Sequence, residues 1–120
     1  MATDDKCCSI APYFTVREGQ LDAIKKLCQR FVEKAGQESG CLYYGFSFSG
    51  REAHCREGFR DAQALLDHLE NIGPLLAEAT QLAEFTRLEI HGPEEELAKV
   101  RPLLRALDPQ YFTLQYGFRR

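Results

Sequence analysis

Glu57 and His68 are the two residues of this sequence whose types and spacing best suit proton transfer. Glu57 stands near the end of a run that is typical of a strand, and His68 lies on a helical segment that begins a few residues later. His68 comes three residues after Leu65 and four before Ile72, which places it at the border of an apolar helix face. An imidazole with an ordinary pKa near ~6.5 can accept a proton from a phenol or hydroquinone. We therefore take His68 as a candidate general base that Glu57 could orient; a purely structural histidine is the alternative.

Aromatic residues form a second group of interest. The five Tyr and eight Phe residues, all except Phe31, fall on segments expected to be strands. Such a sheet surface offers a floor to a flat apolar ligand, although Phe and Tyr also favour strands and fill cores. Tyr44, Phe46 and Phe59 flank the segment nearest Glu57 and His68, so they are the candidate pocket residues.

Basic side chains on two strands are candidates for binding an anionic substrate group. His54 shares a predicted strand face with Arg56 and Arg60, a row that favours a rim or an interface as its first interpretation. Arg87 lies with Glu89 and His91 on the fourth strand, where a cross-strand polar network is equally compatible. We take His54 and Arg87 as candidate substrate-binding residues. No spacing among the three histidines resembles a metal site, so none is predicted.

The elements that must position these residues follow from the hydrophobic pattern. Alternation and β-forming residues predict strands over residues 8–16, 41–48, 51–60, 84–91 and 111–118. Ser49-Gly50 predicts a hairpin between the second and third strands. Apolar residues at helical spacing predict a helix over residues 21–35.

The later helical segments contain breakers. A helix capped by Asp61 is predicted to end at Gly73-Pro74, and a separate helical piece to run from Pro74 to about Ala83. Gly92-Pro93 opens a third helical region whose acidic residues 94–96 are expected to form a solvated first turn. Pro102 interrupts that region.

This order is β-α-β-β-α-β with an added helix and a fifth strand, which predicts an α+β fold of the ferredoxin-like type. Helices would cover one face of an antiparallel sheet. The second strand carries no charge on either face, which favours burial on both sides. We therefore expect a homodimer of the α+β barrel kind, in which the sheets of two chains pack face to face. Residues 1–120 would form one domain, with a core over residues 8–92 and an extension over residues 93–120.

Composition excludes several functional classes. A net charge of -3 with mixed signs offers no basic face to nucleic acid. No apolar run approaches the length of a membrane span, and the first residues lack the pattern of a signal peptide, so a cytoplasmic location is expected. The five cysteines form no CxxC pair and are expected to be free thiols. No motif for nucleotide, flavin, nicotinamide or haem attachment occurs, so no cofactor is predicted.

The chain resembles the antibiotic biosynthesis monooxygenase-like family from about Ser9 to about Ile90. The resemblance rests on a glycine before the second strand, an acid at a strand end, an aromatic residue and an aspartate, and a helix histidine: Gly40, Glu57, Phe59, Asp61 and His68. It implies a dimer that oxidises a quinol or phenol with molecular oxygen and uses neither metal nor flavin. His68 would then be the base, Glu57 its partner and Tyr44 a donor to the oxyanion, with Phe46 and Phe59 as walls. Haem degradation is disfavoured because the sequence has no tryptophan.

Two functions from different classes remain open at this stage. The first is a cofactor-independent monooxygenase that acts on a small aromatic quinol or phenol. The second is a non-catalytic dimer that binds an apolar metabolite or serves assembly. The same fold hosts several activities, so the fold alone does not decide between them.

Overall fold

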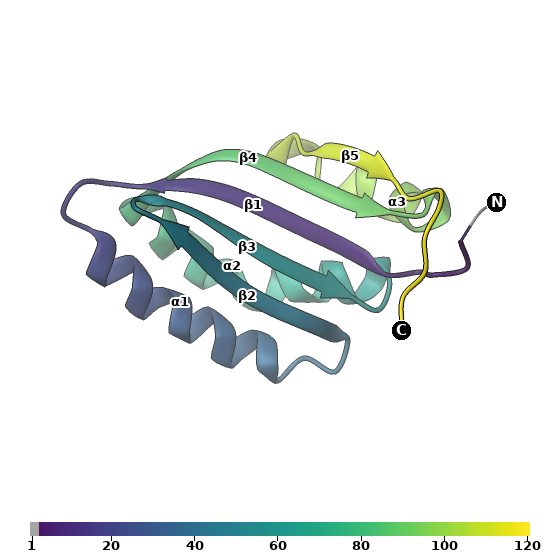
Figure 1. Cartoon of the computed structure of the whole chain (residues 1–120), viewed down its shortest axis with the longest axis horizontal. Coiled ribbons are helices and arrows are strands. Elements are labelled where there is room, and N and C mark those ends of the chain that lie inside the picture. Colours follow the sequence, from purple (N-terminus) through teal and green to yellow (C-terminus); the bar gives the residue numbers. More distant parts are fainter. Residues whose placement is uncertain (1–2) are drawn as a thin grey trace.

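Five strands form a single sheet in the order β2-β3-β1-β4-β5, and two long helices lie behind it in Figure 1. The computed structural model describes residues 3–120. The strands are β1 Cys8–Val16, β2 Cys41–Ser49, β3 Glu52–Phe59, β4 Ala83–Gly92 and β5 Gln110–Thr113. The helices are α1 Leu21–Gly36, α2 Ala62–Leu82 and α3 Glu94–Val100, followed by the 3-10 turns η1 Arg101–Leu103 and η2 Arg105–Leu107.

The first four strands pair antiparallel and confirm the predicted α+β, ferredoxin-like fold. The direction of the fifth strand was not predicted; β5 runs parallel to β4 and makes the sheet mixed. The reason is the crossover: α3, η1 and η2 carry the chain back along β4 as far as Glu89 before it enters β5. Parallel neighbours need such a long connection, whereas a hairpin would have reversed the direction.

Helix α1 confirms the most regular pattern in the sequence. Its buried residues recur at spacings of three and four and face the sheet: Ile24, Leu27, Cys28, Phe31 and Ala35. They share one core cluster with Phe14 of β1 and Ile72 of α2. Helix and sheet therefore bury each other's apolar faces, which is the main source of stability in a small domain.

Helix α2 runs through Gly73 and Pro74 without ending, so the predicted break at this point was wrong. A proline inside a helix removes one hydrogen bond and costs about 3 kcal/mol. Ile72, Leu75 and Ala79 on both sides of it are nearly fully buried. Each larger apolar side chain gains roughly 1.5–3 kcal/mol on burial, so tertiary packing offsets the local defect and keeps α2 continuous.

The last strand is shorter than predicted, because pairing with β4 stops at Thr113. After one further hydrogen bond, from the Leu114 amide to the Gly92 carbonyl, the chain leaves the sheet. It turns toward the N-terminal segment, where Arg119 pairs with Asp5 (Figure 1). Tyr116 and Phe118 are exposed there, although their alternation with polar residues resembles a strand.

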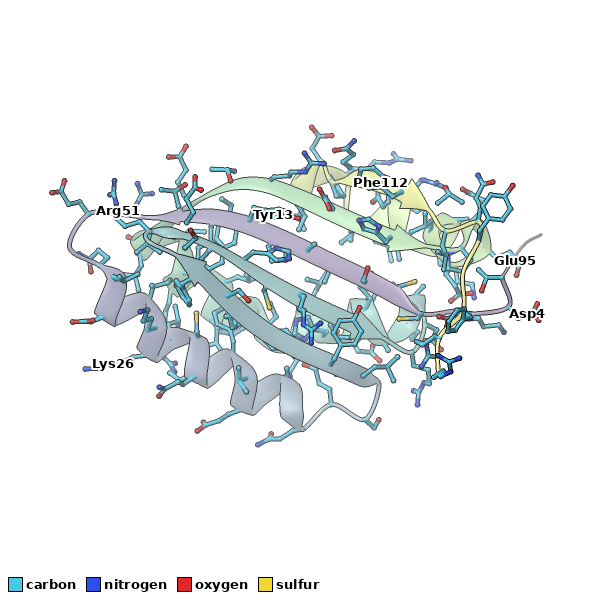
Figure 2. All side chains as sticks on the ribbon, viewed as in Figure 1. Asp4, Tyr13, Lys26, Arg51, Glu95 and Phe112 are labelled. Carbon is cyan, nitrogen blue, oxygen red and sulfur yellow. The ribbon has the colours of Figure 1, made fainter. Side chains whose placement is uncertain are left out.

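The face of the sheet opposite the helices is open in the part of the chain that the structure describes. Tyr13 stacks on His54, and Phe112 stacks on His91, with ring centroids 4.2 and 4.8 Å apart (Figure 2). Small residues such as Ala11 and Gly45 lie between these aromatic groups on the same face. The expected dimer, with its sheet-to-sheet contact, stays a prediction. Among residues 3–120 no helix is both long and apolar enough for a membrane crossing.

Candidate active site

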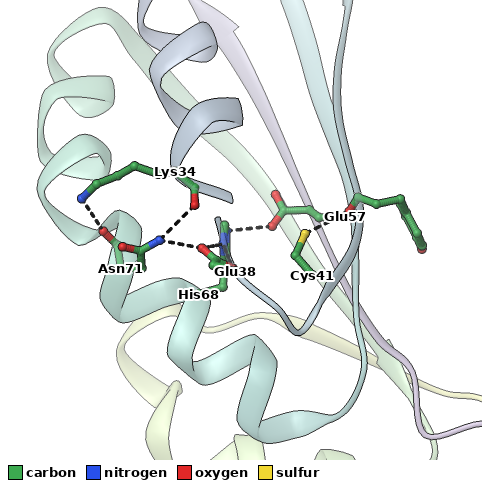
Figure 3. A network of polar contacts seen from close by, with 7 residues as sticks. Lys34, Glu38, Cys41, Glu57, His68 and Asn71 are labelled. Atoms are coloured by element: carbon green, nitrogen blue, oxygen red, sulfur yellow. Dashed lines mark hydrogen bonds and ion pairs between the residues drawn. The ribbon is translucent and has the colours of Figure 1, made fainter. Parts of the chain in front are cut away.

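His68 lies inside the protein with a carboxylate on each side of its ring (Figure 3). Its Nδ1 is 2.9 and 3.0 Å from the two carboxylate oxygens of Glu38, and its Nε2 is 3.2 Å from Oε1 of Glu57. Asp61 caps the start of α2 two turns before His68, and its side chain accepts a hydrogen bond from the Ala64 amide. This start sets the helix rotation that turns His68 inward, together with Leu65 and Ile72.

Glu57 reaches the ring from β3, the strand beside the centre of the sheet. It faces inward between Ile10 of β1 and Tyr44 of β2, and only 4% of it is exposed. Burial raises the pKa of the Glu57 carboxyl, and the nearby His68 opposes this shift without cancelling it. Glu57 can therefore hold a proton at a higher pH than an ordinary glutamate.

Glu38 reaches the ring from the turn between α1 and β2. The Asn71 amide nitrogen donates to Glu38 Oε2 at 2.8 Å, and the Lys34 ammonium donates to the Asn71 carbonyl at 2.9 Å. These bonds join the end of α1 to the middle of α2 (Figure 3). The Glu38 side chain is 14% exposed, so it lies at the solvent side of the cluster, while Glu57 lies at the inner side.

The two carboxylates determine the charge of the imidazole. Burial disfavours the imidazolium and lowers the pKa of His68, but Glu57 and Glu38 outweigh burial, so its pKa is raised above the ordinary 6.5. His68 therefore stays protonated to a higher pH than an ordinary histidine, and in that state both ring nitrogens donate. The protonated ring can pass a proton to a carboxylate, and the role of His68 as a base stays a prediction.

Aromatic rings fix the position of the imidazole. The Phe59 ring lies 4.7 Å and the Tyr44 ring 5.2 Å from the His68 ring, measured between centroids. Phe59 is fully buried, and burial also raises the pKa of the Tyr44 hydroxyl, which therefore stays protonated. The Tyr44 hydroxyl can therefore donate a hydrogen bond, and its role as a donor to a substrate oxyanion stays a prediction.

The cluster lies beside an apolar cavity of about 500 Å³ between the sheet and the helices. Five of the predicted site residues line it: Tyr44, Phe46, Glu57, His68 and Arg87. Most of the remaining wall is apolar and includes Phe14 of β1, Phe31 of α1 and Ile72 of α2. A substrate in this cavity would meet Glu57 and His68 in surroundings that contain little other polarity.

The other end of this cavity lies between α2 and β4. Phe85 and Leu107 line it and are 40% and 51% exposed, and Arg87 and Asp108 are also part of its lining. Arg87 thus lies at the cavity rim, but its guanidinium pairs with Glu89 and Gln110, and strand alternation places its side chain with that of His91 on the open face of the sheet. A larger cleft of about 610 Å³ lies between the chain termini, far from the acid and the imidazole, and we assign it no chemistry.

Two predicted substrate-binding residues lie outside the cavity. His54 faces the open side of the sheet, where its Nδ1 is 3.1 Å from the Pro12 carbonyl oxygen and its ring stacks on Tyr13. Phe59 lies in a second core cluster, together with Leu65 and Ile90, and its ring packs against that of His68. The structure therefore brings His68, Glu57, Tyr44 and Phe46 together, adds Phe59 behind them and Arg87 at the rim, and leaves His54 apart.

The cysteines and the metal-binding side chains give no second centre of chemistry. All five cysteines are free, and burial raises the pKa of Cys8 to about 12 and that of Cys28 to about 11. Thiols with such pKa values react slowly. Within residues 3–120, no group of three or more His, Cys, Asp and Glu side chains has a geometry that could hold a metal ion.

Glu38 and Asn71 are the site residues that the sequence analysis missed. Asn71 could have been predicted, because it follows His68 by three residues on α2 and residues at this spacing share a helix face. Glu38 gave no comparable signal, because residues in a turn have no periodicity that predicts their direction.

The comparisons identify the fold. The chain has the ferredoxin-like α+β fold of the antibiotic biosynthesis monooxygenase-like proteins. Its similarity to one solved structure is much stronger: MupZ from Pseudomonas fluorescens is 48% identical, with a TM-score of 0.95, over 100% of this chain and 94% of that chain. The chain therefore belongs to the family of MupZ.

More distant solved structures share the fold alone. A protein described as an antibiotic biosynthesis monooxygenase is 19% identical, with a TM-score of 0.61, over 69% of this chain and 92% of that chain. SnoaB from Streptomyces nogalater, described as a cofactor-independent oxygenase, is 12% identical, with a TM-score of 0.63, over 71% of this chain and 90% of that chain. No family model and no curated protein sequence matches the chain.

Proposed function

We propose that this protein is an enzyme that needs no cofactor and carries out acid-base chemistry on a small apolar molecule. The observation that carries the proposal is the His68 ring between Glu57 and Glu38 at the wall of an apolar cavity. Buried ionisable groups are costly to keep, and they concentrate where a protein uses their shifted pKa values. A domain that only bound an apolar metabolite would not need this cluster.

The reaction that we propose first is the oxidation of a phenol or quinol with molecular oxygen. Similarity of fold to proteins described as oxygenases supports this choice. Glu57, as its carboxylate, would take the hydroxyl proton of the substrate, and the phenolate would pass one electron to oxygen. Recombination of the two radicals at a ring carbon that carries a hydrogen, ortho or para to the hydroxyl, gives a peroxide. Loss of water from the peroxide leaves a quinone, so phenol and oxygen yield quinone and water.

In this scheme the roles expected from the sequence are exchanged. Glu57 would contact the substrate, because both His68 nitrogens are already occupied by carboxylates and Glu57 lines the cavity. His68 would supply the charge that keeps Glu57 ionised until substrate binds, and Tyr44 would donate to the substrate oxygen as its charge develops. The proton taken by Glu57 returns to the departing oxygen as water.

A second candidate is a proton-transfer reaction that needs no oxygen, such as an isomerisation, an addition or an elimination. The raised pKa of His68 favours it, because the site then keeps a proton donor to a higher pH than an ordinary histidine would. Deprotonation of a phenol requires only a base, whereas isomerisations and additions use an acid and a base at one site.

Oxygen uptake by chelator-treated protein against a panel of hydroquinones and polycyclic phenols tests the first candidate. We expect uptake that falls at least about 100-fold in Glu57→Gln and is unchanged in Glu52→Gln, which removes an exposed carboxylate from the same strand. The same panel, extended with enolisable ketones, is incubated in deuterium oxide without oxygen. Deuterium incorporation that depends on Glu57 would select the second candidate. If neither assay responds, a binding or assembly role is favoured.

A further inference from the structure

The two carboxylates on His68 are not equivalent. Glu38 approaches Nδ1 with both oxygens, at 2.9 and 3.0 Å, whereas Glu57 approaches Nε2 with one oxygen at 3.2 Å. Glu38 does not line the cavity, and Glu57 does. The shorter, two-oxygen contact makes Glu38 the stronger partner of an imidazole N-H.

The surroundings of Glu38 support this difference. Asn71 donates to Glu38 and to the carbonyl of Lys34, so the Glu38 carboxylate is held by a network that includes both long helices. Polar groups within such a network are costly to displace, because each would lose its partner inside the protein. Glu57 has apolar surroundings apart from His68 and its β3 and β2 neighbours Cys55 and Tyr44.

We propose that Glu38, held by Asn71, is a positioning residue that keeps the last proton of the His68 imidazole on Nδ1, so that Nε2 exchanges its proton with Glu57. Protonated His68 donates from both nitrogens. When it loses one proton, the Nδ1-H bond to Glu38 persists, and the Nε2 lone pair faces Glu57. The proton that leaves Nε2 passes to Glu57 and from there to the substrate. A proton that Glu57 takes from the substrate returns to Nε2 by the same route. This role rests on the proposed acid-base function.

Other titratable groups around the ring do not take the place of Glu38. Tyr44 and Cys41 approach from β2, and their pKa values are raised by burial and by the carboxylates, so they stay neutral near neutral pH. Lys34 on α1 reaches the cluster only through Asn71. The tautomer therefore depends on Glu38 and Glu57, of which Glu38 has the closer contact.

Nitrogen-15 NMR of the labelled histidines tests the proposal, because the shifts of Nδ1 and Nε2 report which nitrogen carries the proton. His68→Gln assigns the signals. In the wild-type protein, titrated to the neutral imidazole, we expect the proton on Nδ1. In Glu38→Gln we expect it to move largely to Nε2, and the pKa of His68 to fall by at least about one pH unit. Glu38→Asp should restore part of both values.

Glu70→Gln is the matched control, because it removes an exposed carboxylate next to Asn71 on the same helix. It should leave the His68 tautomer unchanged. If Glu38→Gln does not fold, Asn71→Ala tests the same contact, and a partial move of the proton toward Nε2 is expected. The proposal would be overturned if the wild-type protein carried the proton on Nε2. It would also be overturned if wild type and Glu38→Gln had the same tautomer.

Where a substrate is turned over, Glu38→Gln should lower kcat at least about tenfold and leave KM nearly unchanged, since Glu38 is not in the cavity wall. A change in KM alone would contradict the positioning role. Where no substrate is turned over, the proposed function fails while the NMR result still decides the position of the proton. The two failures are therefore distinguishable.

Discussion

Gly40 lies so close to Ala64 that a β-carbon at position 40 would be 2.5 Å from the Ala64 β-carbon. Gly40 follows Glu38 by two residues in the turn before β2, and Ala64 lies in the first turn of α2. The Gly40 carbonyl also accepts a hydrogen bond from the Arg60 amide at 2.8 Å. The absence of a side chain at Gly40 therefore lets the turn that carries Glu38 lie against the helix that carries His68.

Gly40→Ala should destabilise the protein by about 1–3 kcal/mol, because the methyl group must push α2 or the turn away from its packed position. Urea unfolding measures the change. Gly36→Ala is the control, since nothing lies within 4 Å of a β-carbon there and alanine is the better helix former. We expect that control to be neutral or stabilising by up to about 1 kcal/mol. Equal stability of Gly40→Ala and wild type would show that the turn has room to move.

The pH dependence of stability should reveal the protonated His68. Because its folded-state pKa lies above the unfolded value near 6.5, the stabilisation is complete below that pH and is lost as pH rises through the folded-state pKa. The raised pKa of Glu57 has the same sign, with loss that begins above its ordinary 4.5. We expect the free energy of unfolding to fall by up to about 1.4 kcal/mol per pH unit for each group in its window.

Urea unfolding from about pH 5 to pH 8.5 checks this dependence. The scan stops there because the buried cysteines, with raised pKa values, would add a slope of the same sign above their ordinary 9.0. His68→Gln should remove the contribution of His68 to the slope, and His91→Gln, on the exposed side of β4, should keep it. A wild-type stability that rises from pH 6.5 to 8.5 would contradict the raised pKa of His68.

Much of the fold could be predicted from the sequence because its causes are local. The apolar spacing of α1 and the alternation of β1 depend only on residues within each segment, and both elements occur where they were expected. The continuity of α2 could not be predicted in this way. Pro74 is a strong local breaker, and only the packing of α2 on the sheet, a tertiary property, overrides it.

The acidic run before β5 shows a similar limit. A solvated first turn was expected of residues 94–96, but Glu96 is only 3% exposed. It accepts a hydrogen bond from the Ala62 amide at 3.0 Å and one from Lys99, so it satisfies a free N-H at the start of α2. The sequence contains no sign of this contact, because Ala62 and Glu96 are 34 residues apart and come together only in the folded chain.

The site residues that lie on regular strands and helices were easier to predict than those in turns. Glu57 and Cys55 share a strand face, and His54 must then point to the opposite one, so strand alternation alone could have separated His54 from the pocket. Arg87 reaches the cavity rim beside a register shift between β1 and β4 that no sequence pattern indicates. Glu38 lies in a turn, and only the folded arrangement of α1 and α2 directs it to His68.

Leu107 should influence what the cavity accepts. Its side chain lines the open end, whereas Leu103, in the preceding 3-10 turn, is 66% exposed and does not line the cavity. For a series of 4-alkylphenols, calorimetry with wild-type protein should show affinity that increases with chain length until the chain reaches Leu107. Leu107→Ala should weaken binding of the longer members about threefold to tenfold through lost apolar contact. Leu103→Ala should have no effect, and equal effects of the two variants would exclude a specific role for Leu107.

The open sheet face should carry the dimer contact. Its small residues and its two aromatic stacks would allow a second copy to approach closely, and burial of this face would shield groups such as Tyr13 and Phe112 from water. Light scattering after gel filtration should give twice the mass of one chain. Ala11→Glu places a long charged side chain in the middle of this face and should yield monomers, because it would hold the two sheets apart and its desolvation would be costly. Lys26→Glu, which changes the outer surface of α1, should leave the dimer intact. A wild-type protein that stays monomeric at high concentration would refute this assembly.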